Sequence, residues 1–194
     1  MQVKRQSPLV YTIPNFLTSS MCEYLISLSE NIGYTSAPIT IDASKGIYEF
    51  NEDIRNNSRV IVDNELSANF LFHQLKDKLP LVYKEIWKLK GLNSRFRFYK
   101  YQKGQTFKPH LDGKYKESST CESKLSLLIF LSEDFKGGHT MFEKLANESK
   151  DLSIKPSIGQ VLIFDHHQMH SGDIVLDDGI KYVLRTDVMY TRSN

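Results

Sequence analysis

The second half of this chain of 194 residues reads as one β-strand after another, which limits the folds that it can adopt. Residues 95–101 alternate between two kinds of side chain, which is the period of a strand. Further strands are predicted at residues 125–131, 140–142, 159–164 and 182–190. Glycine-containing turns separate several of them, so we expect a closed or two-sheet β architecture.

The first 90 residues contain helix signals as well as short strands. Ser20 followed by Glu23 predicts the start of one helix, and Asp63 predicts the start of a second. Pro80 either ends the second helix or restarts it as a third helix to about residue 89. The apolar residues expected to face inward are Met21, Leu25, Leu28 and Ile32 in the first helix and Leu66, Phe70, Leu75 and Leu79 in the second. The fold class predicted from both halves is α+β.

Composition excludes several classes of protein. The chain is 40% hydrophobic and carries 25 Lys and Arg against 23 Asp and Glu, so it gives no overall charge signal for nucleic acid or an anionic membrane. No apolar run approaches the ~20 residues of a membrane span, and residues 1–8 lack the apolar stretch of a secretory signal. With only Cys22 and Cys121, we expect no disulfide framework and a reducing, cytoplasmic location.

His110 and Asp112 form the sharpest local feature, in the segment Pro109-His110-Leu111-Asp112-Gly113. Residues two apart in an extended segment point the same way, so both side chains can reach one point. An imidazole and a carboxylate are two of the three ligands of a facial non-haem iron site. Taken alone, these residues are explained as well by a surface hydrogen bond at a strand end.

The C-terminal part of the chain offers a third ligand and a buried cation. His166, His167 and His170 lie in a turn between two predicted strands. In the last strand, Lys181 and Arg185 share one face with Val183 and Asp187. If that face points inward, a buried cation needs an anionic partner such as the carboxylate of a small cosubstrate. The alternative is that both cations line a solvated face.

Taken in order, residues 95–190 resemble the 2-oxoglutarate- and Fe(II)-dependent oxygenases, and within them the prolyl 4-hydroxylase-like branch. Residues 54–59 resemble the region that precedes the core in this branch, so about half of the chain matches well and the N-terminal half more loosely. The matching pieces are Phe98-Tyr99-Lys100-Tyr101, Pro109-His110-x-Asp112, Gly137-Gly138-x-Thr140, residues 159–164, and His170-x-Gly172 leading to Gly179-x-Lys181-Tyr182.

The resemblance implies a double-stranded β-helix, or jelly roll, with the N-terminal helices packed on its larger sheet. It implies a single domain over residues 1–194, with residues 1–90 as a support region and 91–194 as the core. By motif position, His110, Asp112 and His170 would hold Fe(II). His170 is preferred over His166 and His167, because Ser-Gly follows it.

The resemblance also places the cosubstrate. Lys181 sits where the family has the basic residue that pairs with the distal carboxylate of 2-oxoglutarate, and Tyr101 sits where a tyrosine contacts the same molecule. Arg185 is a further candidate for this contact, because Phe130 replaces a tyrosine that is frequent in relatives. Lys181 is placed first, and the choice between the two cations stays open.

The implied activity is that of a 2-oxoglutarate- and Fe(II)-dependent dioxygenase, which also consumes O2, with ascorbate as an optional addition. It would hydroxylate an unactivated carbon, most readily in a prolyl or other amino-acid residue of a protein or peptide. Tyr99, Arg97 and Arg59 are the hypothesised substrate contacts. One alternative is the same chemistry on a free amino acid or small metabolite, and another is a non-catalytic metal-binding jelly-roll module. The charge balance argues against a nucleic-acid substrate.

Overall fold

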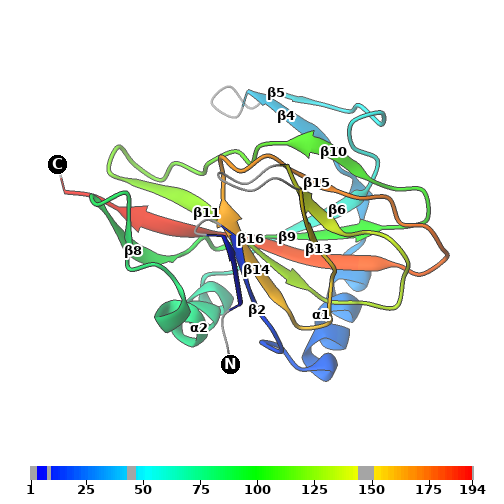
Figure 1. Cartoon of the computed structure of the whole chain (residues 1–194), viewed down its shortest axis with the longest axis horizontal. Helices are drawn as coiled ribbons and strands as arrows, with labels where there is room; N and C mark the ends of the chain where they lie inside the picture. Colours follow the sequence, from blue (N-terminus) through cyan, green and yellow to red (C-terminus); the bar gives the residue numbers. More distant parts are fainter. Residues whose placement is uncertain (1–3, 8–9, 43–46, 144–150, 194) are drawn as a thin grey trace.

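The computed structural model describes residues 4–7, 10–42, 47–143 and 151–193. This part of the chain is mostly antiparallel β-structure, with two α-helices and two main sheets. Figure 1 shows both helices on one side of the larger sheet and strands β10 and β15 on the other. None of the described helices is long and apolar enough to cross a membrane.

The larger sheet has ten strands in the described part of the chain. Its main path runs in the order β1, β2, β14, β11, β16, β9, β6, β3, and β8 pairs with both β16 and β7. The bounds are Lys4–Ser7 (β1), Val10–Ile13 (β2), Thr35–Ser36 (β3), Ser58–Asp63 (β6), Val82–Tyr83 (β7), Trp87–Leu92 (β8), Arg95–Tyr101 (β9), Cys121–Phe130 (β11), Val161–Asp165 (β14) and Lys181–Thr191 (β16).

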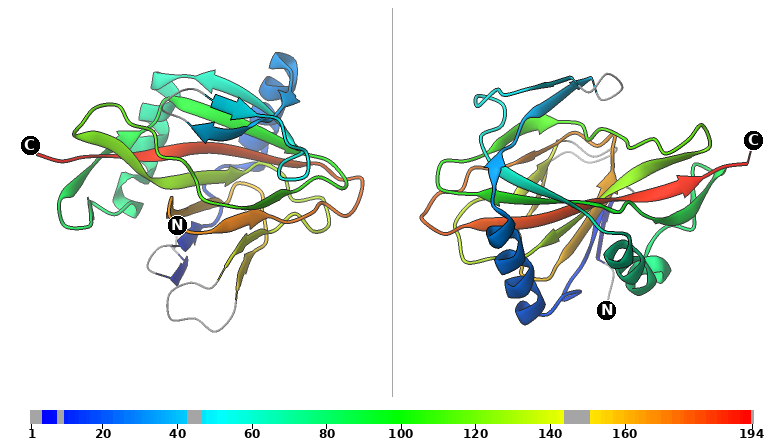
Figure 2. Two further views of the ribbon diagram at one scale, coloured as in Figure 1. Left: turned by 90° about the horizontal axis from the view of Figure 1, so that it is seen from above. Right: turned by 180° about the vertical axis from the view of Figure 1, so that it is seen from behind.

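The smaller sheet has four strands in the order β10, β15, β12, β13. These are Phe107–His110 (β10), Thr140–Phe142 (β12), Leu152–Ile154 (β13) and His170–Gly172 (β15). A separate hairpin of Ile39–Asp42 (β4) and Ile47–Glu49 (β5) projects from the molecule on the side of β10 (Figure 2). The strands predicted in the second half of the chain are confirmed, with shifts of a few residues at their ends.

Two apolar cores lie on the two faces of the larger sheet. Strand β16 contributes to both, because alternate side chains point to opposite faces. Tyr182 and Leu184 join the core beneath the helices, whereas Val183 joins the core between the two sheets. The second core also contains Phe142 of β12 and Phe164 of β14, which flank the candidate site.

Helix α1 (Ser19–Ile32) corrects two predictions. Its N-cap is Thr18, whose hydroxyl accepts a hydrogen bond from the backbone of Met21, so Ser20 lies inside the helix. The buried residues of this helix are Cys22 and Ser29. The predicted inward face is wrong in large part, since Met21, Leu28 and Ile32 are exposed and Leu25 is partly buried.

Helix α2 (Glu65–Leu75) begins after the N-cap Asn64, one residue later than predicted. Its buried residues are Ala68, Leu71 and Leu75, whereas the predicted inward residues Leu66 and Phe70 are exposed. A short 3₁₀ turn, Lys76–Lys78 (η1), follows it.

The predicted third helix to about residue 89 is wrong, because this segment forms β7 and β8. Lys84 and Glu85 have positive φ between these strands, which a continuous helix does not tolerate. The segment is drawn into the sheet because β8 pairs with β16.

Two leucines of α2 provide a stability test of this orientation. Leu75 is 0% exposed and Leu66 is 83% exposed. We expect Leu75→Ala to lower the free energy of unfolding by about 2–5 kcal/mol, because it leaves a cavity. Leu66→Ala should change it by about 0.5 kcal/mol or less. Denaturant unfolding of both variants checks this, and equal losses would contradict the observed face.

Candidate metal centre

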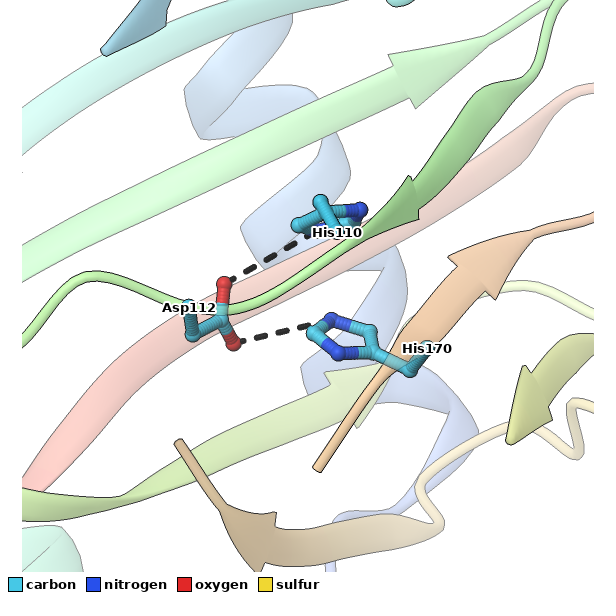
Figure 3. A group of neighbouring side chains, drawn as sticks. All are labelled: His110, Asp112 and His170. Carbon is cyan, nitrogen blue, oxygen red and sulfur yellow. Dashed lines mark ion pairs between the residues drawn. The ribbon is translucent and has the colours of Figure 1, made fainter. Parts of the chain in front are cut away.

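Three side chains that could hold a metal ion meet between the two sheets (Figure 3). His110 ends β10, Asp112 follows two residues later, and His170 begins β15. His110 and His170 are direct cross-strand partners, so the pairing of β10 with β15 brings distant parts of the chain together. One ligand atom from each of the three residues lies within 4.8 Å of the others.

Both imidazole rings present the same nitrogen to the centre. The Nδ1 atoms of His110 and His170 lie 2.8 and 3.0 Å from the backbone oxygens of Lys108 and Gln168. Each Nδ1 therefore carries the proton and donates it, which leaves the lone pair on Nε2. The Nε2 atoms lie 3.8 Å (His110) and 3.6 Å (His170) from the carboxylate of Asp112. Burial lowers the pKa of His170 and lowers that of His110 to about 3, so both rings are neutral.

Asp112 is held through both of its carboxylate oxygens. Arg185 Nη1 donates to Oδ1 at 2.5 Å, and the Ser126 hydroxyl donates to Oδ2 at 2.5 Å. Burial raises the pKa of this carboxyl group, but Arg185, the two imidazoles and Ser126 outweigh burial and hold the pKa well below its usual range. Asp112 is therefore an ionised carboxylate with a fixed orientation.

A chain of buried hydrogen bonds continues behind Asp112. Ser126 Oγ lies 2.9 Å from His166 Nδ1, and His166 Nε2 lies 2.8 Å from Ser123 Oγ. Because Ser126 gives its proton to Asp112, His166 must donate from Nδ1 and accept from Ser123 at Nε2. Ser123 in turn accepts from the backbone N–H of Tyr115. One neutral tautomer of His166 satisfies every polar group in this chain.

The hydroxyl of Ser126 should therefore affect metal affinity without touching the metal. We expect Ser126→Ala to weaken divalent metal binding about 10–100-fold, the usual effect of losing a partner that orients a ligand. Titration with Fe(II) or Co(II) measures this, with Ser153→Ala as the control, since the exposed Ser153 bonds His139 instead. Unchanged affinity in Ser126→Ala would show that the carboxylate needs no such support.

The same three residues line a cavity together with a buried cation, Lys181. Lys181 is 3% exposed, its Nζ donates to the backbone oxygen of Gly138 at 2.7 Å, and it lies 5.0 Å from the ring centroid of Tyr101. Burial lowers its pKa to about 8, and only the exposed Asp173 acts in the other direction. No carboxylate pairs with Lys181 within the described ranges. A buried ammonium group that faces a cavity favours an anionic ligand there.

Gly138 leaves the space that the Lys181 side chain occupies. Its φ is +62°, a conformation that side chains other than glycine rarely adopt. An added Cβ would lie 2.8 Å from the ring of Phe135 and 3.2 Å from Cδ of Lys181. The glycine pair Gly137-Gly138 thus lets the backbone approach closely enough to accept the lysine hydrogen bond.

The remaining predicted site residues lie on or beside the cavity. Tyr99, Tyr101 and Arg185 line it. Arg185 binds Asp112 through Nη1 and Asp187 through Nη2, so carboxylates of the chain occupy both groups. Arg97 and Arg59 lie on the same face of the sheet but do not line the cavity.

The other histidines near the centre lie outside the ligand group. His166 belongs to the hydrogen-bond chain behind Asp112, whereas the side chain of His167 is 75% exposed and pairs with Asp165. His139 bonds Ser153. The role of Ser126 was missed in the sequence, although a serine inside the apolar run 125–131 was a usable signal.

Phe107 is a second residue that the sequence reasoning did not assign. Its ring stacks on that of His110, with centroids 3.5 Å apart and planes inclined by 17°. The Arg55 guanidinium lies over the Phe107 ring, 4.4 Å from its centroid. The aromatic ring restricts rotation of His110 and shields one side of it from water.

The donor set fits a ferrous ion. Two neutral imidazoles and one carboxylate on one side leave further coordination positions open, which is the arrangement of non-haem Fe(II) oxygenases. The buried ammonium of Lys181 in the same cavity fits an anionic cosubstrate.

Comparisons with known proteins agree with this assignment. The family model described as the 2OG-Fe(II) oxygenase superfamily matches residues 96–186. The chain is 23% identical over 196 residues to prolyl 4-hydroxylase 1 of Arabidopsis thaliana, covering 90% of this chain and 67% of the relative.

Solved structures of prolyl hydroxylases share the fold. The viral collagen prolyl hydroxylase of Paramecium bursaria Chlorella virus-1, in complex with 2-oxoglutarate, has a TM-score of 0.63 and 17% identity, covering 95% of this chain and 97% of its own. A prolyl hydroxylase of Trichoplax adhaerens, in complex with a peptide fragment of the hypoxia inducible factor oxygen degradation domain, has a TM-score of 0.71 and 16% identity, covering 92% and 82%. Residues 96–186 thus match the 2-oxoglutarate- and Fe(II)-dependent oxygenase superfamily, whose members use Fe(II), 2-oxoglutarate and O2, and the chain as a whole is similar to prolyl 4-hydroxylases.

Proposed function

We propose that this protein is a dioxygenase that hydroxylates an unactivated carbon of a prolyl or other amino-acid residue in a protein or peptide. The observation that carries this proposal is the meeting of His110, Asp112 and His170 in one cavity with the buried, unpaired ammonium of Lys181. A metal-binding module without catalysis has no need of that ammonium group.

The residues divide the work as follows. His110, Asp112 and His170 would hold Fe(II), and Lys181 would bind the distal carboxylate of 2-oxoglutarate beside Tyr101. Lys181 is favoured over Arg185 because both Nη groups of Arg185 already bind carboxylates of the chain. When bound, iron and 2-oxoglutarate together supply the oxidation, in which O2 gives one oxygen atom to succinate and one to the substrate carbon.

The chain supplies geometry and charge for this chemistry. Arg185 and Ser126 fix the orientation of Asp112. Backbone oxygens fix the tautomers of His110 and His170, and Phe107 covers the ring of His110. Tyr99 lines the open part of the cavity, where we place the substrate, with Arg97 and Arg59 beside it.

A peptide substrate is supported by the named activities of the relatives. The Arabidopsis relative is a prolyl 4-hydroxylase, and the Trichoplax structure holds a peptide fragment. Because these proteins are only 16–23% identical to this chain, a free amino acid with the same chemistry is kept as the second candidate.

The fold and location follow from the same proposal. We propose that the two sheets form a double-stranded β-helix, and that residues 1–194 form one domain. Strands β2, β6 and β8 of the support region pair directly with strands of the core, which supports one domain. A cytoplasmic location is supported by the two free cysteines, Cys22 and Cys121.

Anaerobic addition of Fe(II) and 2-oxoglutarate tests the chemistry. We expect a weak visible charge-transfer band that needs both components. Peptides and free amino acids are then screened with O2 for succinate release and for a mass gain of one oxygen atom. Absence of the band in folded, metal-loaded protein would refute the oxygenase proposal. Oxidation of free amino acids alone would select the second candidate.

The pKa of Lys181 predicts how 2-oxoglutarate affinity depends on pH. The free protein holds the ammonium charged below about pH 8 and loses the proton above it. The half-saturating concentration of 2-oxoglutarate should therefore rise above pH 8, by up to about tenfold per pH unit. Lys181→Arg should remove this rise, since arginine stays charged. Binding measured between pH 7 and pH 9.5 checks it, and a flat profile in the wild type would contradict it.

A further inference from the structure

An excess of positive charge lies beside the cavity, on the face of the larger sheet that points toward the smaller one. In the register of the strands, Arg59 of β6 lies opposite Tyr99 of β9, and Arg97 of β9 lies opposite Arg185 of β16. Residues that lie opposite each other share a face of the sheet. We use the name arginine strip for Arg55, Arg59 and Arg97.

One carboxylate, Asp187, forms ion pairs with two of the arginines on this face, Arg97 and Arg185. Its Oδ2 accepts from Arg97 Nη1 and from Asn93 Nδ2, both at 3.3 Å, and its Oδ1 accepts from Arg185 Nη2 at 3.2 Å. Directly opposed like charges such as Arg97 and Arg185 are unfavourable without such a bridge. Asp187 is 0% exposed, and its single negative charge is already shared between two guanidinium groups.

Arg55 and Arg59 differ from Arg97 in this respect. Among the residues whose side chains the structure describes, no carboxylate forms an ion pair with either of them. Burial is the main cause that lowers the pKa of Arg59. The positive charges of Arg55 and Arg97 lower it further. This half-buried guanidinium therefore lies among cations.

Arg55 is the most constrained member of the strip. It is 7% exposed, and its guanidinium lies 4.8 Å from the ring centroid of Tyr99 and 4.4 Å from that of Phe107, two residues that line the cavity. Its Nε donates to Asn57, but its Nη2 is buried without a hydrogen-bond partner in the described part of the chain. A buried guanidinium N–H without a partner is costly, and an incoming acceptor relieves that cost.

The pKa of the Tyr99 phenol depends on the positive charges of the neighbouring guanidinium groups. Burial raises the pKa of Tyr99, but the guanidinium groups of Arg185, Arg55 and Arg97 outweigh burial and bring the pKa below its ordinary value. The surrounding guanidinium groups thus favour negative charge at the phenol oxygen of Tyr99.

We propose that the arginine strip binds a carboxylate of the substrate, so that this enzyme prefers acidic substrates. The inference rests on the proposed function and specifies its substrate class. The carboxylate is either an Asp or Glu side chain near the hydroxylated residue or the α-carboxylate of a free amino acid.

This carboxylate site is separate from that of 2-oxoglutarate. Lys181 and Arg185 are four residues apart on β16, which places their Cα atoms about 13 Å apart. Arg97 lies opposite Arg185, and Tyr101 lies opposite Lys181. Arg97 thus continues this face away from the ammonium, whereas Arg55 lies beside Tyr99 and Phe107.

Binding is measured anaerobically with Fe(II) and 2-oxoglutarate present, so the result does not depend on turnover. The probes are proline-containing peptides that differ only by Glu or Gln next to the proline, and free L-proline against L-prolinamide. We expect the acidic peptide, or the free carboxylate, to bind about tenfold or more tightly than its neutral partner. Which of the two pairs shows the difference identifies the source of the carboxylate.

Arg59→Gln is the variant that tests the strip, because Arg59 is half-buried and pairs with no carboxylate whose side chain the structure describes. We expect it to reduce the preference for the acidic probe to about twofold or less, since one charge-assisted hydrogen bond is lost. The matched control is Arg95→Gln on β9, whose exposed side chain pairs with Asp63 and which should keep the full preference.

Two results would overturn the inference. Equal affinity for acidic and neutral probes in the wild type is one, and an undiminished preference in Arg59→Gln is the other. Either result leaves the proposed function standing if the charge-transfer band and succinate release are present. Loss of the band in the wild type would instead count against the proposed function itself.

Discussion

Asp112→Ala should abolish 2-oxoglutarate turnover. Asp112 supplies the only carboxylate of the three-residue donor group, and its oxygens lie within reach of both imidazole Nε2 atoms. Loss of an orienting partner typically costs 10–100-fold in metal affinity, so loss of the ligand itself should cost more than that. Succinate release with saturating Fe(II) and 2-oxoglutarate measures the effect.

The alanine variant has a second consequence, which the experiment must separate from the first. Arg185 is buried and loses its partner at Oδ1, which typically costs about 3–5 kcal/mol of stability. Asp112→Asn is the remedy, because the amide keeps the shape and one acceptor oxygen for Arg185 but lacks the charge. Thermal unfolding of both variants shows whether they are folded under the assay conditions.

The control for both variants is Asp178→Ala. The side chain of Asp178 is 92% exposed and pairs with Lys103, so its loss should leave turnover and stability nearly unchanged. Undiminished succinate release by a folded Asp112 variant would remove this residue from the metal site.

The β-strands were predictable because their signal is local. The alternation in residues 95–101 predicts a strand with two unlike faces. The apolar run near residue 128 predicts a strand that is buried on both faces. The helical faces were not predictable in this way. Helix α2 buries small Ala68 against the sheet and leaves Phe70 exposed, because the space available on the sheet decides which side docks.

The segment after Pro80 shows the same limit. Its composition allows a helix, and only the pairing of β8 with β16 makes it a strand. Such a long-range partner leaves no mark in the local sequence.

The residues of the candidate site also differ in whether local sequence or long-range pairing brings them together. The spacing of His110 and Asp112 places both on one side of an extended segment, and this was visible in the sequence. The addition of His170 rested on the family resemblance, because it depends on the pairing of β10 with β15. The partners Ser126 and His166 come from β11 and from the turn after β14, so no spacing rule could have connected them to Asp112.

Lys181→Ala should raise the half-saturating concentration of 2-oxoglutarate by about two to three and a half orders of magnitude. A buried ion pair that loses one partner typically costs about 3–5 kcal/mol, and 1.4 kcal/mol corresponds to tenfold in affinity. The carboxylate of bound 2-oxoglutarate would be left in a cavity where Lys181 is the group best placed to neutralise it. The control is Lys103→Ala, whose side chain is 60% exposed and pairs with Asp178.

Stability without ligand separates a binding role of Lys181 from a structural one. In the free protein this ammonium is buried with a single backbone acceptor, and burial lowers its pKa to about 8. Its charge therefore opposes folding at neutral pH, and Lys181→Met, which keeps the length of the side chain, should unfold at the same or a higher temperature than the wild type. Added 2-oxoglutarate should raise the melting temperature of the metal-loaded wild type and have little effect on the variant. A variant that is less stable alone but gains as much from 2-oxoglutarate as the wild type would show that Lys181 supports the fold and does not bind the cosubstrate.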